Sequence, residues 1–323
     1  MFITDRQFIY NGIPSYTYGL RFAWMEQSVD STMSSDKTYS TIKNKANNTF
    51  SIAKTRHDSP LEFDVEIIST RVLAPFEVRE VYKYLFNNNK YCKLQFDDTD
   101  DESMYLNCIF INPKRIEGGV GDGYGVVGFR AKVVCDAPWG WSEDIENKYE
   151  FKTSTDKSRS ASYAMTVRYL DDEAKTAEFV IENNTDADEY IYPEVEFETV
   201  KESDISESNL LNHCSLSNCI ACYYKTNCAR GDIPCRASIV NLSDSSARST
   251  CVFWNEDTDG NGVSMVLNMN GLNGTIRGVG ADNVNRISNT NKTFVRLVPG
   301  ENVFRVQNIK SITFKYKEAR ILV

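Results

Sequence analysis

A strand that is followed by a proline and two tryptophans limits how this chain can fold. Residues 128–135 alternate in side-chain character, as expected for a β-strand with one buried face. Pro138 has no N–H group to donate to a sheet ladder, so the strand ends before it, and residues 139–141 form a bulky Trp-Gly-Trp corner. We interpret this corner as a domain boundary, with an N-terminal domain over residues 1–141 and a C-terminal domain over residues 142–323. A strand end inside one large sheet is the alternative.

The composition indicates a folded chain that is rich in β structure. With 323 residues, of which 41% are hydrophobic and 12% aromatic, the chain can bury one large core or two ordinary ones. Its 17 Tyr and 17 Phe residues favour strands. The formal net charge of −9 argues against specific nucleic-acid binding and against docking on an anionic membrane, because both require a basic surface.

The N-terminus and the apolar stretches predict a soluble protein that is made in a cytoplasm. Residues 1–6 lack the basic region and apolar run of a signal peptide. No apolar stretch approaches the roughly 18 residues that a membrane helix needs. In that compartment the nine cysteines are expected to be thiols first.

The N-terminal half predicts several strands and one amphipathic helix. An Asn-Gly turn between two short strands fits residues 8–15, whereas residues 30–48 are polar without a period and predict a long exposed loop or arm. Apolar residues at helical spacing predict a helix over residues 76–86, and glycines predict a connection over residues 117–125. The helix is expected to pack on the core, with partner binding as the alternative. Its apolar stripe comprises Val78, Val81, Tyr82, Leu85 and Phe86, and further strands are expected at residues 16–22, 61–68, 91–96 and 104–111.

The C-terminal half predicts a β-sandwich or barrel, because short strands recur there between Asn, Asp and Gly turns. The expected strands are 163–169, 177–182, 194–200, 238–242, 251–254, 264–269, 302–306 and 312–316. Residues 204–235 do not fit this pattern, since they have little periodicity and hold five of the nine cysteines. We expect a Cys-rich insertion there that reaches to about residue 250. The fold class is therefore mainly β, with an α+β N-terminal domain that contains one helix.

Several short motifs, taken in order and spacing, resemble the distal tail protein (Dit) family of long-tailed phages. They are Phe8-x-Tyr10-Asn11-Gly12-x-x-Ser15, Tyr18-Gly19-Leu20, Pro60-Leu61-Glu62-Phe63, the helix after Ala74-Pro75, Leu94-x-Phe96-Asp97-Asp98, Cys135-Asp136-Ala137-Pro138, Tyr192-Pro193-Glu194-Val195-Glu196-Phe197 and the stretch from Phe294 to Asn302. Together the motifs cover almost the whole chain except the Cys-rich insertion.

The resemblance implies a structural function in the virion. Proteins of this family form a hexameric ring at the tail tip through the N-terminal domain, and their C-terminal domain is a galectin-like β-sandwich. The ring joins the tail tube protein to the tail-tip or tail-associated lysin protein, and in some phages to receptor-binding proteins, while DNA passes through its centre. The resemblance thus implies a homo-hexamer in the virion tail tip that is assembled in the host cytoplasm, does not bind specific nucleic-acid sequences and does not bind a membrane.

A carbohydrate-binding adhesion module that recognises host surface glycans is the alternative function. Such a module would stack sugars on exposed aromatic side chains of the second sandwich, and Trp254 is the candidate residue. A buried core position is the favoured interpretation of the same tryptophan.

The sequence offers no catalytic constellation, and we expect that the protein is not an enzyme. It has two histidines, His57 and His213, so no Ser-His-Asp triad, Cys-His pair or His-rich metal site can be assembled around them with any specificity. Paired carboxylates suffice for some hydrolases, but any pair chosen among 45 acidic residues is uninformative.

The Cys-rich segment is the one candidate for a metal site. Its first three cysteines have the C-x4-C-x2-C spacing of three iron–sulfur ligands in plant-type ferredoxins, and thiolates at this spacing also suit zinc. The second CxxC pair of a zinc ribbon is absent, so free or disulfide-linked cysteines are the favoured interpretation, and no cofactor is expected. The candidate ligands are Cys214, Cys219, Cys222 and Cys228.

Two other polar motifs predict turns in preference to ion sites. Residues 257–262 resemble the start of a calcium loop, but Asn268 stands where an EF-hand has its Glu and the flanks predict strands, so a hairpin turn is favoured. The acidic run over residues 97–102 is expected to be a solvated turn.

Overall fold

A computed structural model shows two compact units, and each is described by itself. Unit 1 comprises Met1–Glu143 with Ala319–Val323, and unit 2 comprises Asp144–Glu318. Strand β10 (Gly140–Trp141) pairs with β21 (Ala319–Arg320), a partner from the far end of the chain that no sequence pattern indicated. The structure describes residues 6–24, 37–44, 49–57, 59–96, 104–120, 123–151, 168–169, 176–187, 189–199, 235–246, 249–253, 266–279, 285–287 and 290–320.

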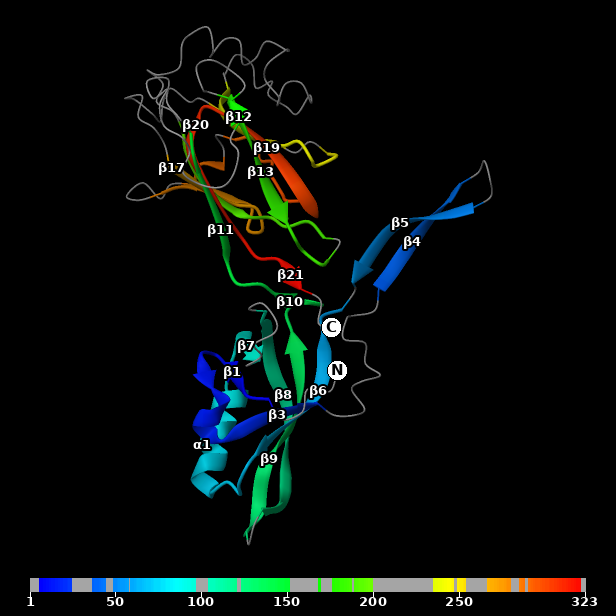
Figure 1. Cartoon of the computed structure of the whole chain (residues 1–323), viewed down its shortest axis with the longest axis vertical. Helices are drawn as coiled ribbons and strands as arrows, with labels where there is room; N and C mark the ends of the chain where they lie inside the picture. The colour runs from blue at the N-terminus through cyan, green and yellow to red at the C-terminus, as the bar shows by residue number, and fades with distance from the viewer. Residues whose placement is uncertain are drawn as a thin grey trace. The chain divides into compact units, whose positions relative to one another are not determined.

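Unit 1 is built on one antiparallel sheet, whose strands differ in length and follow the order β2-β1-β7-β8-β9-β6-β3 (Figure 1). Its strands are β1 (Phe8–Tyr10), β2 (Ile13–Pro14), β3 (Leu20–Trp24), β6 (Glu62–Ser69), β7 (Cys92–Phe96), β8 (Leu106–Val120) and β9 (Gly123–Cys135). With a second, all-β unit described below, this confirms the mainly β fold class.

The opening motif of the chain forms a tight hairpin, as its Asn-Gly pair predicts. Asn11 and Gly12 both have positive φ, at 50° and 77°, which suits the type I′ turn between β1 and β2. Ser15 Oγ accepts a hydrogen bond of 3.0 Å from the buried Phe8 N–H. The strand expected over residues 16–22 is wrong in its first half, because Ser15–Tyr18 form a 3₁₀ turn that ends at Gly19.

The sheet of unit 1 curls until its two edge regions meet. The rings of Phe8 in β1 and Phe22 in β3 lie edge to face at 5.7 Å, although four strands lie between β1 and β3 in the sheet order. Arg6, just before β1, forms a β-bridge with Phe22, and the Phe22 N–H donates to the Arg6 carbonyl at 2.8 Å. The curled sheet can therefore enclose a core on its concave side.

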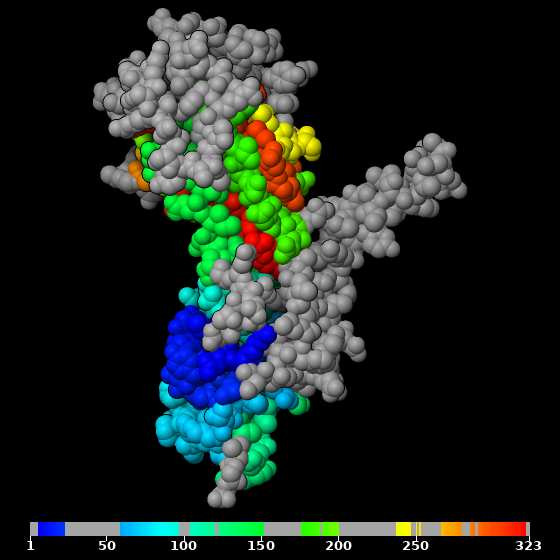
Figure 2. Space-filling model, viewed as in Figure 1, coloured from blue at the N-terminus to red at the C-terminus, as the bar shows by residue number. Residues whose placement is uncertain are grey.

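The predicted helix is confirmed as α1 (Pro75–Phe86), and it packs on this core. Its buried side chains are Val78, Val81, Tyr84 and Leu85, so core packing is confirmed for most of the apolar stripe. Tyr82 was assigned to that stripe and is 47% exposed, whereas Tyr84 stacks on Tyr18 at 4.9 Å. In Figure 2 the N-terminal strands (blue) adjoin the region of the helix (cyan) on the surface of unit 1, as this packing requires.

A long hairpin replaces the glycine-rich connection expected over residues 117–125. Strands β8 and β9 pair as far as Val120 and Gly123, so Gly118, Gly119, Gly123 and Gly125 lie in the ladder. At one end the hairpin extends past α1 (Figure 1), and Tyr124 near its end is 77% exposed. Close strand approach explains one glycine, because a Cβ on Gly128 would lie 2.3 Å from the Ile67 carbonyl oxygen.

The region expected to be a polar loop contains a second hairpin. Strands β4 (Lys37–Asn44) and β5 (Thr49–His57) pair antiparallel with one bulge. Of the loop or arm predicted over residues 30–48, the loop is therefore wrong for the described residues 37–44, whereas the hairpin is compatible with an arm. The Thr, Tyr and Ile residues of this polar segment give it enough β propensity to form a strand. We refer to the segment from Lys37 to His57 as the arm.

Unit 2 consists of two five-stranded antiparallel sheets, as the strand pattern of the C-terminal half predicts. Their orders are β11-β20-β14-β17-β18 and β12-β13-β19-β15-β16. The strands are β11 (Ile145–Glu150), β12 (Arg168–Tyr169), β13 (Thr176–Asn183), β14 (Glu194–Thr199), β15 (Cys235–Asn241), β16 (Ser249–Phe253), β17 (Val266–Asn270), β18 (Thr275–Gly278), β19 (Gly300–Gln307) and β20 (Ile309–Tyr316).

Aromatic rings from both sheets form the core of unit 2. Phe179 of β13 stacks on Phe304 of the neighbouring strand β19, with ring centroids 5.6 Å apart. Phe314 of the other sheet lies 4.8 Å from Phe304, and Tyr149 lies 4.1 Å from Phe179. These contacts across the sheets define a β-sandwich whose inner faces are closely packed.

Candidate functional site

The residues that the sequence suggested as binding sites lie outside the described part of the chain. This holds for Cys214, Cys219, Cys222, Cys228 and Trp254, whose roles stay predictions. Among the residues that the structure describes, no group of three or more His, Cys, Asp or Glu side chains is placed to hold a metal ion. The described residues instead show what the recurring sequence motifs do in the fold and which charged surfaces the chain presents.

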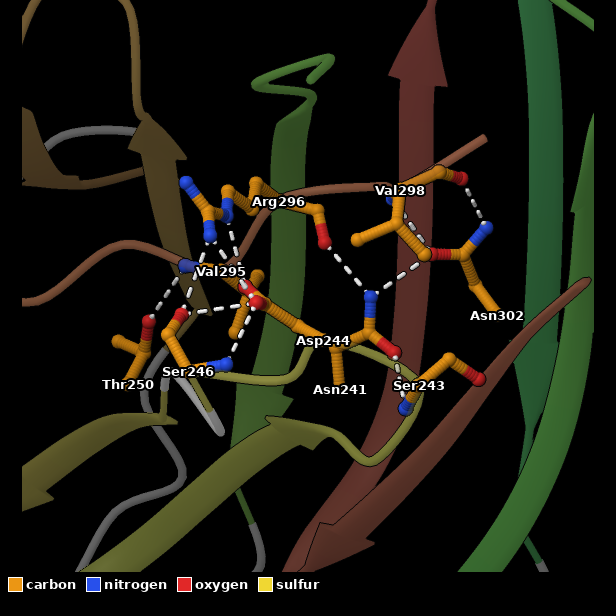
Figure 3. Close-up of polar contacts among 9 residues, drawn as sticks. All are labelled: Asn241, Ser243, Asp244, Ser246, Thr250, Val295, Arg296, Val298 and Asn302. Atoms are coloured by element: carbon orange, nitrogen blue, oxygen red, sulfur yellow. Dashed lines mark hydrogen bonds and ion pairs between the residues drawn. The ribbon is translucent and has the colours of Figure 1, made fainter. Parts of the chain in front are cut away.

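A buried ion pair holds the stretch from Phe294 to Asn302 (Figure 3). Arg296 Nε lies 2.7 Å from Asp244 Oδ2, and Arg296 Nη2 lies 3.0 Å from Asp244 Oδ1. The Asp244 side chain is 0% exposed and the Arg296 side chain is 10% exposed. The guanidinium carbon also lies 3.5 Å from the ring centroid of Tyr190. The two-bond fork and the ring contact together fix the orientation of the arginine.

The electrostatics of this pair favour the charged forms of both groups. Burial raises the pKa of the Asp244 carboxyl, but hydrogen bonds from Arg296 and Ser246 outweigh it and leave that pKa below its usual value. The hydrogen bond to Asp244 raises the pKa of Arg296. Since both charges are satisfied inside the chain, the pair serves to position the loops of unit 2 and does not offer a charge to a ligand.

Two buried asparagines extend the ion pair into a network that closes the same turn (Figure 3). Asn302 Oδ1 accepts hydrogen bonds from the Val298 N–H at 2.7 Å and from Asn241 Nδ2 at 2.8 Å. Asn302 Nδ2 donates to the Gly300 carbonyl at 2.8 Å, and Gly300 itself has a φ of +85°. We call Asn241, Asp244, Arg296 and Asn302 the clamp. The clamp gives the motif over residues 294–302 a structural explanation.

The face of β6 and β9 that points away from the core carries a ladder of ion pairs. Glu62 pairs with Lys132, and Glu66 pairs with Arg130, whose Nε lies 3.1 Å from Glu66 Oε1. All four side chains are at least 30% exposed, so these pairs contribute little to stability. The ladder therefore marks a water-facing, mixed-charge surface on unit 1.

The arm is the second candidate surface, and its charge differs from that of the chain as a whole. Its 21 residues include Lys37, Lys43, Lys45, Lys54 and Arg56 and no Asp or Glu, in a chain whose net charge is −9. Strands β4 and β5 form a sheet of their own that joins no other strand among the described residues. The arm is thus a basic hairpin attached to an acidic protein.

The fold and these surfaces define the class of protein. Residues 3–137, almost all of unit 1, match the family model described as the phage tail protein N-terminal domain. The N-terminal part of the chain therefore carries a domain found in phage tail proteins. No curated protein matches the sequence of this chain, and no helix in the described ranges is long and apolar enough to span a bilayer.

Comparison with solved structures gives the fold of the chain. The crystal structure of the SPP1 Dit protein, titled a paradigm of the hub adsorption apparatus of phages that infect Gram-positive bacteria, superposes with a TM-score of 0.51 at 12% identity, over 97% of this chain and 99% of that chain. The phage P2 baseplate in its calcium-activated conformation gives a TM-score of 0.46 at 11% identity, over 99% of this chain and 100% of that chain. The comparison with the SPP1 protein shows that this chain shares the fold of the Dit protein, and together with the match over residues 3–137 it confirms the resemblance that the motifs indicated.

Proposed function

We propose that this protein forms a hexameric ring at the tip of a phage tail and joins the tail tube protein to the tail-tip or lysin protein. The observation that carries the proposal is the combination of a tail-protein N-terminal domain with an arm that has no strand partner in the described part of its own chain. On this proposal unit 2 is a galectin-like domain that faces outward, toward receptor-binding proteins where the phage has them.

The isolated arm supports assembly on energetic grounds. A two-stranded hairpin is at best marginally stable in water, and it needs a third strand or a packing surface to be stable. The arm pairs only within itself among the described strands. Contact with a second copy of the chain supplies that missing surface.

The charge of the arm supports a head-to-tail contact. The arm carries only positive side chains, while the rest of the chain is strongly acidic, so the arm of one copy is attracted to the acidic surface of the next. A contact between two different patches is heterologous, and heterologous contacts close into a ring when the rotation between copies permits it. Complementary charge therefore favours a ring over a two-fold dimer.

The overall charge also suits a channel for DNA. A net charge of −9 per chain raises the cost of close contact with phosphates, so a DNA rod would slide through the ring without adhering to it. On this proposal the protein has a structural function without catalysis and is assembled in the host cytoplasm as part of the virion.

The test is the mass and shape of the purified chain. Light scattering after size exclusion should give six times the chain mass of 36.7 kDa, and negative-stain images of that peak should show six-fold rings with a central hole. A stable monomer at high concentration, both alone and mixed with the neighbouring tail protein, would contradict the proposal. A glycan screen of the same sample tests the carbohydrate-binding alternative, which predicts binding by monomers or dimers.

A further inference from the structure

Three buried cysteines form a row across the sheet of unit 1. Cys92 of β7 is directly opposite Cys108 of β8, and Cys108 is directly opposite Cys135 of β9. The three residues are at most 3% exposed and belong to one hydrophobic cluster. Ring formation through the arm does not use them, and they are separate from the Cys-rich segment in sequence.

The backbone hydrogen bonds distinguish the two neighbouring pairs. The Asp136 N–H donates to the Asn107 carbonyl at 2.9 Å, while the Cys135 N–H points to the Leu61 carbonyl of the other neighbouring segment, also at 2.9 Å. Cys108 and Cys135 are therefore a non-hydrogen-bonded pair of the β8–β9 ladder. In such pairs the Cα atoms are about 4.5 Å apart and the side chains approach more closely than in hydrogen-bonded pairs. This spacing lies in the range of roughly 4.4–6.8 Å that a disulfide spans.

The thiol contacts agree with the backbone geometry. The Cys135 thiol is hydrogen-bonded to the Cys108 thiol. Burial raises the pKa of Cys108, and this hydrogen bond raises it further. Cys92 Sγ instead donates to the Lys90 carbonyl at 3.5 Å. The row thus contains one pair, Cys108 and Cys135, that is placed to form a disulfide, and a third thiol, Cys92, that points to the backbone instead.

We propose that Cys108 and Cys135 are an oxidative modification site, at which a small peroxide forms a disulfide between β8 and β9. The sulfur of one thiol attacks a peroxide oxygen while the thiol proton passes to the departing oxygen, so that the O–O bond breaks, one water leaves and a sulfenic acid forms. The second thiol attacks that sulfur, the S–S bond forms and a second water leaves. Two thiols are oxidised by two electrons, and one peroxide is reduced to two waters. The bond would close the base of the long hairpin, beside the point where the chain leaves unit 1.

The test is a disulfide map of the full chain after treatment with hydrogen peroxide. Protein purified under reducing conditions is oxidised in the folded state, unfolded with an alkylating reagent and digested for mass spectrometry. We expect a Cys108–Cys135 linked peptide to exceed any Cys92–Cys108 peptide by at least about tenfold. Closing a 28-residue segment should also raise the melting temperature of unit 1 by roughly 5–10 °C.

Two variants separate the proposal from non-specific oxidation. Cys92→Ala should keep the linked peptide and the shift in melting temperature, whereas Cys135→Ala should lose both. Peroxide treatment that leaves Cys108 and Cys135 fully alkylated, joins Cys92 to Cys108, or yields only separate sulfinic acids would overturn the proposal. The map of the unsubstituted chain decides the matter even if Cys135→Ala does not fold.

Discussion

At the scale of single residues, the buried charge of Asp244 is the feature for which we expect a single substitution to cost the most stability. The Asp244 carboxylate is fully buried, and it is tolerated there because Arg296 supplies a two-bond fork and a nearby positive charge. A buried pair of this kind contributes modestly compared with apolar packing of the same volume, but removing one partner leaves an uncompensated charge in the core.

Replacing Arg296 with alanine should therefore strongly destabilise unit 2. We expect Arg296→Ala to lower the free energy of unfolding by about 3–5 kcal/mol, because the Asp244 charge would lose its partner. The double variant Arg296→Met with Asp244→Leu should recover most of that loss, since it removes both charges and keeps the volume. Denaturant unfolding of the three proteins measures the effect. Equal destabilisation of the single and double variants would show that the ion pair is not the source.

A second residue-scale prediction concerns the start of α1. Hydrogen bonds from Arg71 and from the Ala74 N–H, at 2.7 Å and 2.8 Å, lower the pKa of Glu77 to about 2 from an ordinary 4.5. Because the folded-state pKa is depressed, the stability contributed by ionised Glu77 is fully present above pH 4.5 and is lost as the pH falls toward 2.

Glu77→Gln should accordingly flatten the acid-induced loss of stability. The variant should melt earlier than the unsubstituted protein at pH 7, and the two melting curves should converge as the pH falls through this window. Glu80→Gln is the matched control on the same helix, because Glu80 pairs only with the exposed Lys83 at 2.8 Å. If the melting temperatures of Glu77→Gln and the unsubstituted protein differ by the same amount at every pH, the ionisation of Glu77 is not linked to stability and the prediction is wrong.

At the scale of secondary-structure elements, the arm is the feature on which assembly depends. The proposed head-to-tail contact places its positive side chains against the acidic surface of the next copy. Reversing charges in the arm should thus convert an attraction into a repulsion, without disturbing the core of either unit.

The double variant Lys43→Glu with Lys54→Glu should weaken ring formation. We expect the concentration needed for half-assembly to rise by at least about tenfold, because each reversed charge changes the interaction by about 1 kcal/mol or more. Arg79→Glu with Lys90→Glu changes the net charge equally at exposed positions on and just after α1, and it should assemble normally. Light scattering over a dilution series measures both. Equal weakening by the two variants would assign the effect to net charge and not to the arm.

The elements also show how far sequence patterns reach in this fold. Period and turn chemistry located α1, the Asn11–Gly12 hairpin and most strands of unit 2, because these depend on residues close in sequence. The two strands of the arm were missed, and so was the extension of the expected strands over residues 104–111 and 128–135 through the glycine-rich segment. Lys-rich and Gly-rich strands carry little apolar periodicity and are stabilised by pairing across the ladder. The clamp was also missed, because Asp244 and Arg296 are brought together only by the tertiary fold.

At the scale of the whole molecule, the positive charge of the arm favours contact with DNA, whereas the negative net charge of the chain opposes it. Five positive residues in one hairpin could serve as phosphate ligands, yet the chain as a whole carries a charge of −9. The two roles are distinguished by what the arm faces in the ring. If it is occupied by the acidic surface of the next copy, its charge is neutralised and unavailable to DNA.

The assembled ring should therefore fail to bind double-stranded DNA at about 150 mM salt, where non-specific binders typically have dissociation constants of about 10⁻⁴–10⁻⁶ M. Fluorescence anisotropy of a labelled duplex, titrated with ring-sized protein, should remain flat. The Lys43→Glu with Lys54→Glu variant should give the same flat titration, since neither protein exposes a basic channel. Binding that weakens steeply with salt and disappears in that variant would instead place the arm against the DNA, and would leave the contact between neighbouring copies to be sought on the sheet of unit 1.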